Sequence, residues 1–366
     1  MEDLEMFHHF ITVTCTTLSD RAESHRLWRE VVPQLAFEHE FLMRGILAIS
    51  ALHLSTLRHD RHDYYLNLAV RQQDSALSQF RAAMATEMYE SKGDAFFAMS
   101  TVIVVYGFES PKAADSLGMF NYNGEDSDEW LPLIRGVNSV IQSVWMTIKG
   151  GRLNGLLHDF NDSPNGTDLP PILSEQLEYL DRYCDALDGC EEDIQACKDA
   201  AYHLRKCFIR INNKTAYECE VSLAFLWPVY IPQHYVQMLH KKRPEALIIL
   251  SHYCVTLYHL DRYWWLNGWA QHIIHNIRQE LHPELHYWIQ WPMNTVHLRT
   301  NFVTNGDLDN PIQGTRVSSD FDIAIDRQLA IPKREILDVQ NNDSPSSKFD
   351  NLNEGEFAKQ TLALAS

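Results

Sequence analysis

The stretch HEFLMRGILAISALHLSTL, residues 39–57, decides the fold class. Its apolar residues fall on nearly every side of a helix and not on one stripe, which is typical of a helix surrounded by other helices. Gly45, Ala48 and Ala51 are small enough to let a partner helix approach closely. The stretch therefore predicts the central helix of a multi-helix bundle.

The next segment, residues 63–88, shows a cleaner helical period. Tyr65, Ala69 and Phe80 lie on one apolar stripe, and Gln72 lies mostly off it. We therefore predict a half-buried helix that packs against the central one.

Two further helices have recognisable ends. Asp94 is placed to cap a helix over 94–108, and the pair Gly150-Gly151 should stop a helix over 130–151. We find no internal repeat and no convincing pair of strand patterns. The chain therefore predicts an all-α fold, with a single large domain over residues 1–300.

The C-terminal part of this domain is rich in aromatic residues. The stretch RPEALIILSHYCVTL, from Arg243, is apolar on most faces, and RYWWLNGWA, residues 262–270, follows it. Trp265 and Trp269 continue a four-residue recurrence, so we predict that both lie on one helix and face inward. Such a core can pack completely or enclose an apolar ligand pocket, and the residues alone leave both alternatives open.

Composition restricts the function classes. The net charge is −18, from 31 basic and 49 acidic residues, which disfavours direct binding to nucleic acid. The N-terminal MEDLEMFHHF has acid where a signal peptide needs base, and the longest apolar run, 95–108, is too short to span a bilayer. We therefore predict an intracellular protein, in the nucleus or cytoplasm, without stable membrane insertion.

From residue 301 to 366 the chain becomes polar, and we predict an irregular, disordered tail.

No strong catalytic or metal motif is present. The seven cysteines are odd in number and lack CxxC spacing, so we predict free thiols, no metal and no cofactor. His252, Tyr253 and His272 are the candidates for an acid or base. For each of the two histidines the competing interpretation is a hydrogen-bonded residue of the fold.

Several motifs occur in an order that resembles a known family. The features are Trp28, Val32, Pro33, Ala36, His39 and Ser50 to Leu54, the Arg135-Gly136-Val137 helix, RPEALIILSHYCVTL, WWLNGWAQHI, and WIQWP at 288–292. With these features the chain resembles, over roughly residues 5–293, the C-terminal regulatory domain of fungal Zn2Cys6 transcription factors of the sterol uptake control type.

The resemblance also shows what is different here. The family binds DNA through an N-terminal cluster of six cysteines with two zinc ions and a basic linker, and this sequence begins inside the regulatory domain. If Met1 is the true start, we expect no direct DNA contact. The expected partners are then an apolar small molecule and either a second copy or a full-length family member, as a homodimer or heterodimer.

The resemblance implies a ligand and a site. Sterol-responsive members hold a sterol in an apolar pocket, which here would involve Trp265, Trp269, Trp145 and Phe41, with Gly268 permitting close packing. The primary hypothesis is therefore a stand-alone ligand-binding regulatory domain. The alternative is an enzyme of a biosynthetic pathway, a cyclase or isomerase that binds an apolar intermediate, and a third is an inactive remnant.

Overall fold

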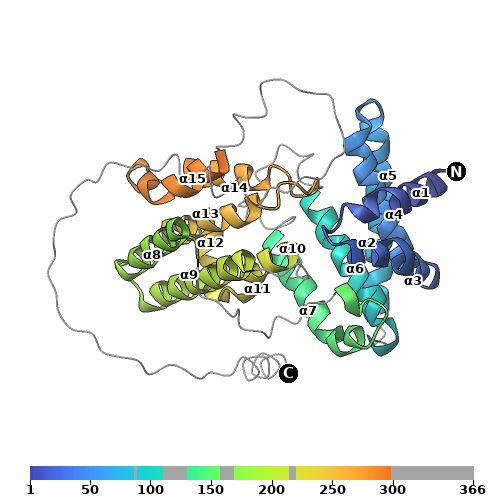
Figure 1. Ribbon diagram of the computed structural model, residues 1–366, viewed down its shortest axis with the longest axis horizontal. Helices are drawn as coiled ribbons and strands as arrows, with labels where there is room; N and C mark the ends of the chain where they lie inside the picture. Colours follow the sequence, from blue (N-terminus) through green and yellow to red (C-terminus); the bar gives the residue numbers. More distant parts are fainter. Residues whose placement is uncertain (86–88, 110–129, 157–168, 214–219, 298–366) are drawn as a thin grey trace. The chain divides into compact units, whose positions relative to one another are not determined.

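The computed structural model describes residues 1–85, 89–109, 130–156, 169–213 and 220–297. Within these ranges every regular element is helical, which confirms the predicted all-α fold (Figure 1). Short 3-10 or π-helical turns link several of the helices. The α-helices are α1 (Glu2–Thr12), α2 (Ala22–Arg26), α3 (Val32–Glu38), α4 (Glu40–Leu57), α5 (His62–Met84), α6 (Tyr89–Glu109), α7 (Trp130–Lys149), α8 (Pro171–Asp185), α9 (Glu191–Asn212), α10 (Glu220–Ala224), α11 (Leu226–Tyr230), α12 (Gln233–His240), α13 (Pro244–Tyr258), α14 (Trp269–Glu280) and α15 (Gln290–His297).

The chain divides into two units, residues 1–309 and 310–366. All described residues belong to the first unit. The predicted irregular tail over 301–366 lies outside the described residues, so the domain boundary near residue 300 stays a prediction.

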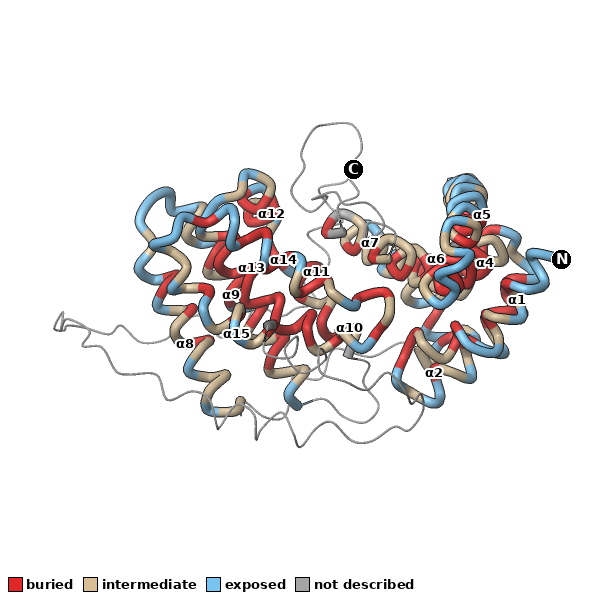
Figure 2. Tube along the Cα trace, turned by 90° about the horizontal axis from the view of Figure 1, so that it is seen from above, coloured by how far each residue is buried: buried red, intermediate tan, exposed pale blue. Residues whose placement is uncertain are grey.

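Helix α4 has the surroundings that its composition predicts. Its residues from Gly45 to Ser55 are buried without a break (Figure 2). By length and hydropathy α4 could also cross a membrane, but 72% of the relevant window is buried by the rest of the protein. A core helix passes the same test of length and composition, so α4 is weak evidence for a membrane span.

Helix α1 is fastened to the hairpin of α4 and α5. Met6 and Phe10 are buried, and the Ser50 hydroxyl donates a 2.6 Å hydrogen bond to the Met6 carbonyl. On the other side the Tyr65 hydroxyl donates to Glu5 at 2.7 Å. Apolar burial and these hydrogen bonds together therefore fix the position of the first helix.

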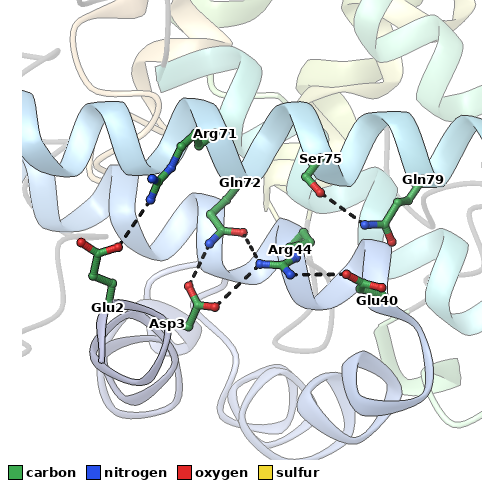
Figure 3. A network of polar contacts seen from close by, with 8 residues as sticks. All are labelled: Glu2, Asp3, Glu40, Arg44, Arg71, Gln72, Ser75 and Gln79. Atoms are coloured by element: carbon green, nitrogen blue, oxygen red, sulfur yellow. Dashed lines mark hydrogen bonds and ion pairs between the residues drawn. The ribbon is translucent and has the colours of Figure 1, made fainter.

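The polar network in Figure 3 corrects one sequence expectation. Gln72, predicted mostly off the apolar stripe of α5, is buried. Its Nε2 donates to Asp3 at 2.9 Å and its Oε1 accepts from Arg44 at 3.2 Å. A buried amide is tolerated when both of its ends are hydrogen-bonded, and here the partners come from α1 and α4.

Helix α6 packs against both α4 and α7. A Cβ atom on Gly45 would lie 2.7 Å from Met99 Sδ and 3.1 Å from Val102 Cγ1, so the predicted close approach at Gly45 is confirmed. The predicted cap at Asp94 is wrong, because α6 already begins at Tyr89. The Asp94 carboxylate instead accepts backbone N–H bonds from Arg152 and Leu153, at 2.7 and 3.3 Å, in the turn after α7.

Helix α13 is the central helix of the C-terminal part. All of its residues from Ala246 to Tyr258 are buried, with Pro244 in its first turn as predicted. It packs against α9, α12, α14 and α15. Buried polar tips there find backbone partners: the Trp227 indole donates to Ala200 O at 2.9 Å, and the Tyr235 hydroxyl to Ala246 O at 2.8 Å.

Candidate functional site

The tryptophan-rich stretch forms a turn before it forms a helix. The sequence predicts that Trp265 and Trp269 share one helix, but α14 begins only at Trp269, so this prediction is wrong. Gly268 precedes the helix with φ of +82°, a left-handed conformation that L side chains rarely adopt. The Asp261 carboxylate accepts the Gly268 N–H at 2.7 Å and holds the turn.

The role of Gly268 differs from the one implied by the resemblance. A Cβ atom added at this position would meet no heavy atom within 4 Å. The glycine is therefore required by backbone conformation and not by close packing.

Five aromatic residues meet at this turn, and we call them the tryptophan junction: Phe108, Phe225, Tyr263, Trp265 and Trp269. The Phe108 ring is central, with centroid distances of 5.9 Å to Trp265, 5.1 Å to Trp269 and 5.3 Å to Phe225. Tyr263 lies 6.0 Å from Trp265. The junction thus joins the end of α6, the start of α11 and the turn before α14.

The two predicted tryptophans have different polar environments. The Trp269 indole N–H donates a 2.6 Å bond to the carbonyl of Phe108, in the last turn of α6. Trp265 is only 2% exposed, and its Nε1 has no hydrogen-bond partner among the described residues. A buried donor without an acceptor costs roughly 1–3 kcal/mol, so a ligand oxygen that accepts a hydrogen bond from this atom would offset that cost.

The structure does not bring all predicted pocket residues together. Phe41 packs against Phe80 and Phe96, at 5.6 and 5.7 Å. Phe96 and Phe108 are twelve residues apart on α6, which corresponds to about 18 Å along the helix. Trp145 is half-buried on α7. The described ring contacts of Phe41 are to His39, Phe80 and Phe96 and not to the junction, so the ligand role of Phe41 and Trp145 stays a prediction.

The neighbouring Trp264 serves a structural connection that sequence reasoning missed. Its indole stacks on His53 of α4 at 4.5 Å and donates to the Thr17 hydroxyl at 2.9 Å. His53 is buried, and its Nδ1 lies 3.1 Å from the Thr14 hydroxyl. Burial lowers the pKa of His53 to about 4, so its ring is neutral at pH 7. In the sequence, the position of His53 between Leu52 and Leu54 of an apolar helix is the signal that its ring is buried.

The three acid–base candidates occupy separate environments. His252 is 1% exposed; its Nδ1 donates to Ile248 O at 2.9 Å, and its Nε2 has no partner among the described residues. The Tyr253 hydroxyl donates to Ala224 O at 3.2 Å. His272 is exposed on α14, where its Nε2 accepts from Asn276 at 3.1 Å. Burial lowers the pKa of His252 to about 4, and catalytic roles for these residues stay predictions.

The described cysteines are free thiols: Cys15, Cys184, Cys190, Cys197, Cys207 and Cys254. Burial raises the pKa of Cys184, Cys197 and Cys207 to about 12. Thiols that stay protonated at pH 7 are poor nucleophiles and poor metal ligands. In the part of the chain that the structure describes, no three His, Cys, Asp or Glu residues converge as a metal-binding group.

The fold and the site define an all-helical domain with a buried aromatic junction. Residues 5–184 match the fungal specific transcription factor domain. The chain thus contains the regulatory domain of a fungal transcription factor, distantly related to Zn2Cys6 factors and to sterol uptake control proteins.

Three relatives support this assignment. A Zn(2)-C6 fungal-type transcription factor of Gibberella zeae is 25% identical over 318 residues, 81% of this chain and 62% of the relative. Sterol uptake control protein 2 of Saccharomyces cerevisiae is 20% identical over 74% of this chain and 29% of its own. Its namesake in Candida albicans is 24% identical over 76% and 40%. The chain therefore spans less than two thirds of each of these proteins.

Proposed function

We propose that this regulatory domain binds an apolar, sterol-like small molecule at the tryptophan junction and thereby controls transcription. The observation that carries the proposal is the Trp265 indole N–H, which is buried among aromatic rings and has no acceptor among the described residues. Aromatic faces suit a rigid apolar body, and one polar group is enough to orient it. The names of the relatives from Saccharomyces cerevisiae and Candida albicans support a sterol-like ligand.

The proposal extends to the partners and the place of action. The net charge of −18 supports a chain that does not itself bind DNA phosphates. Transcriptional control would then pass through a second copy or a full-length family member, in the nucleus or in exchange between nucleus and cytoplasm.

The test uses the full chain and ergosterol as the probe. We expect ergosterol to raise the melting temperature and to change tryptophan fluorescence, because a ligand that binds the native state stabilises it. Trp265→Phe should weaken ergosterol binding by roughly five- to thirtyfold, since it removes one hydrogen-bond donor of about 1–2 kcal/mol.

The matched control is Trp264→Phe. This indole N–H is already bonded to Thr17, so the variant should lose stability but keep ergosterol affinity. A purified protein that carries no lipid and shows no shift with any sterol would refute the proposal.

A cellular experiment separates the regulator from the enzyme. Deletion of the gene should change transcripts of its target genes if the chain is a regulator. Unchanged transcripts together with accumulation of a pathway intermediate would favour the cyclase or isomerase alternative.

A further inference from the structure

Arg135 on α7 is a half-buried cation that forms no ion pair with any residue that the structure describes. Its Nη1 donates a 3.2 Å bond to the Ile231 carbonyl, which follows α11. No carboxylate of a described residue forms an ion pair with it, whereas Arg44, Arg152 and Arg243 each have one or more. Burial also lowers the pKa of Arg135.

The described contacts leave most of the guanidinium N–H donors of Arg135 open to water or to a ligand. The group carries five N–H donors in a planar fork, and the described contacts use one of them. A cation taken partly out of water is stabilised by an anion, and the fork fits the two oxygens of a carboxylate. An anionic group of a ligand could therefore pair with the remaining donors of Arg135.

Two helices connect Arg135 to the tryptophan junction. A Cβ atom on Gly107 would overlap the Leu133 side chain, so the start of α7 is pressed against the end of α6, next to Phe108. Helix α11 makes a second connection: Phe225 at its start stacks on Phe108, and Ile231 at its end accepts from Arg135. Phe225 and Ile231 are six residues apart across this helix, which corresponds to a backbone separation of about 9 Å.

We propose that the ligand of this domain is an amphipathic carboxylic acid, whose apolar body lies at the tryptophan junction and whose carboxylate pairs with Arg135. The inference rests on the proposed function and makes it more specific. A ligand of this class needs a rigid or extended body of about 9 Å between its apolar contacts and its acid group.

The test compares two probes with one skeleton on the full chain. Lithocholic acid carries a carboxylate at the end of its side chain, and the corresponding alcohol carries a hydroxymethyl group there. We expect the acid to bind the wild-type protein at least about tenfold more tightly, because a charge-assisted pair is stronger than a neutral one. Arg135→Gln should remove this preference and leave the affinity for the alcohol within about twofold.

Two further variants control for structure. Arg152→Gln removes an exposed guanidinium that pairs with Glu38 and should keep the preference for the acid. Arg135→Lys retains the positive charge and should recover part of the preference for the acid. Circular dichroism checks that each variant is folded.

Each outcome is decisive. Equal binding of acid and alcohol to the wild type, or a preference that survives in folded Arg135→Gln, would overturn the inference. If ergosterol binds and lithocholic acid does not, the inference fails and the proposed function stands. If lithocholic acid, its alcohol and ergosterol all fail to bind, the inference and the proposed function both fail.

Discussion

Trp265 and Trp269 look equivalent in the sequence, but in the structure they differ in one hydrogen bond. Trp269 donates to the Phe108 carbonyl, and Trp265 donates to no described group. Replacement by phenylalanine removes a similar amount of ring from either position. Only at Trp269 does it also break a buried hydrogen bond.

We therefore predict that Trp269→Phe lowers the free energy of unfolding by about 1 kcal/mol more than Trp265→Phe does. Urea unfolding of the two ligand-free variants measures the difference. A larger loss at Trp265 would mean that its indole N–H has a partner in solution.

Gly268 offers a second prediction at this scale. Gly268→Ala should lower the free energy of unfolding by about 1 kcal/mol, because the left-handed backbone is strained for alanine although space is open. The matched control is Gly136→Ala in α7, where space is also open and φ is ordinary; it should stabilise by up to about 1 kcal/mol through helix propensity. Equal effects of the two changes on the free energy of unfolding would show that the left-handed backbone at position 268 does not strain alanine.

At the scale of elements, Asp94 links two helices that the sequence treats as separate. Its carboxylate binds two backbone N–H groups beyond α7, and a Cβ atom on Gly151 would collide with it. We predict that Asp94→Ala lowers the free energy of unfolding by about 1–2 kcal/mol and that Asp94→Asn has an intermediate effect.

Thermal or urea unfolding checks the Asp94 prediction. Asp74→Ala, an exposed aspartate on α5, is the control and should change stability by less than about 0.5 kcal/mol. If Asp94→Ala behaves like this control, the turn after α7 does not depend on the carboxylate.

At the scale of the whole molecule, two buried histidines predict a dependence on acid. The pKa values of His53 and His252 are lowered from 6.5 to about 4, so the unfolded chain binds protons that the folded chain does not. This contribution to stability is complete above about pH 6.5 and is lost as the pH falls from 6.5 to 4.

As the pH falls within that window, we expect each histidine to lower the free energy of unfolding by about 1 kcal/mol per pH unit. Urea unfolding between pH 7.5 and 4.5 should show a smaller slope for His252→Gln than for the wild type. His59→Gln, which replaces an exposed histidine, is the control variant. An identical slope in His252→Gln would show that His252 is not buried in its neutral form.

Several features of this protein were determined by its sequence alone. The all-round apolar character of residues 39–57 and of α13 predicts central helices, and both are buried as expected, because a helix without a polar face must be enclosed. Gly45 predicts the close approach of a partner helix because it has no side chain to keep that helix away. The ordered motifs likewise predict the regulatory domain that the match over residues 5–184 supports.

Only the tertiary structure decided which side chains meet. Phe108, Phe225 and Trp265 come from three segments far apart in the chain, and periodicity cannot place such segments side by side. The same limit explains the errors at Asp94 and Gln72, whose polar groups are bonded to backbone or side chains of distant elements. Periodicity reports the face of one helix, whereas a hydrogen bond between helices depends on how both are packed.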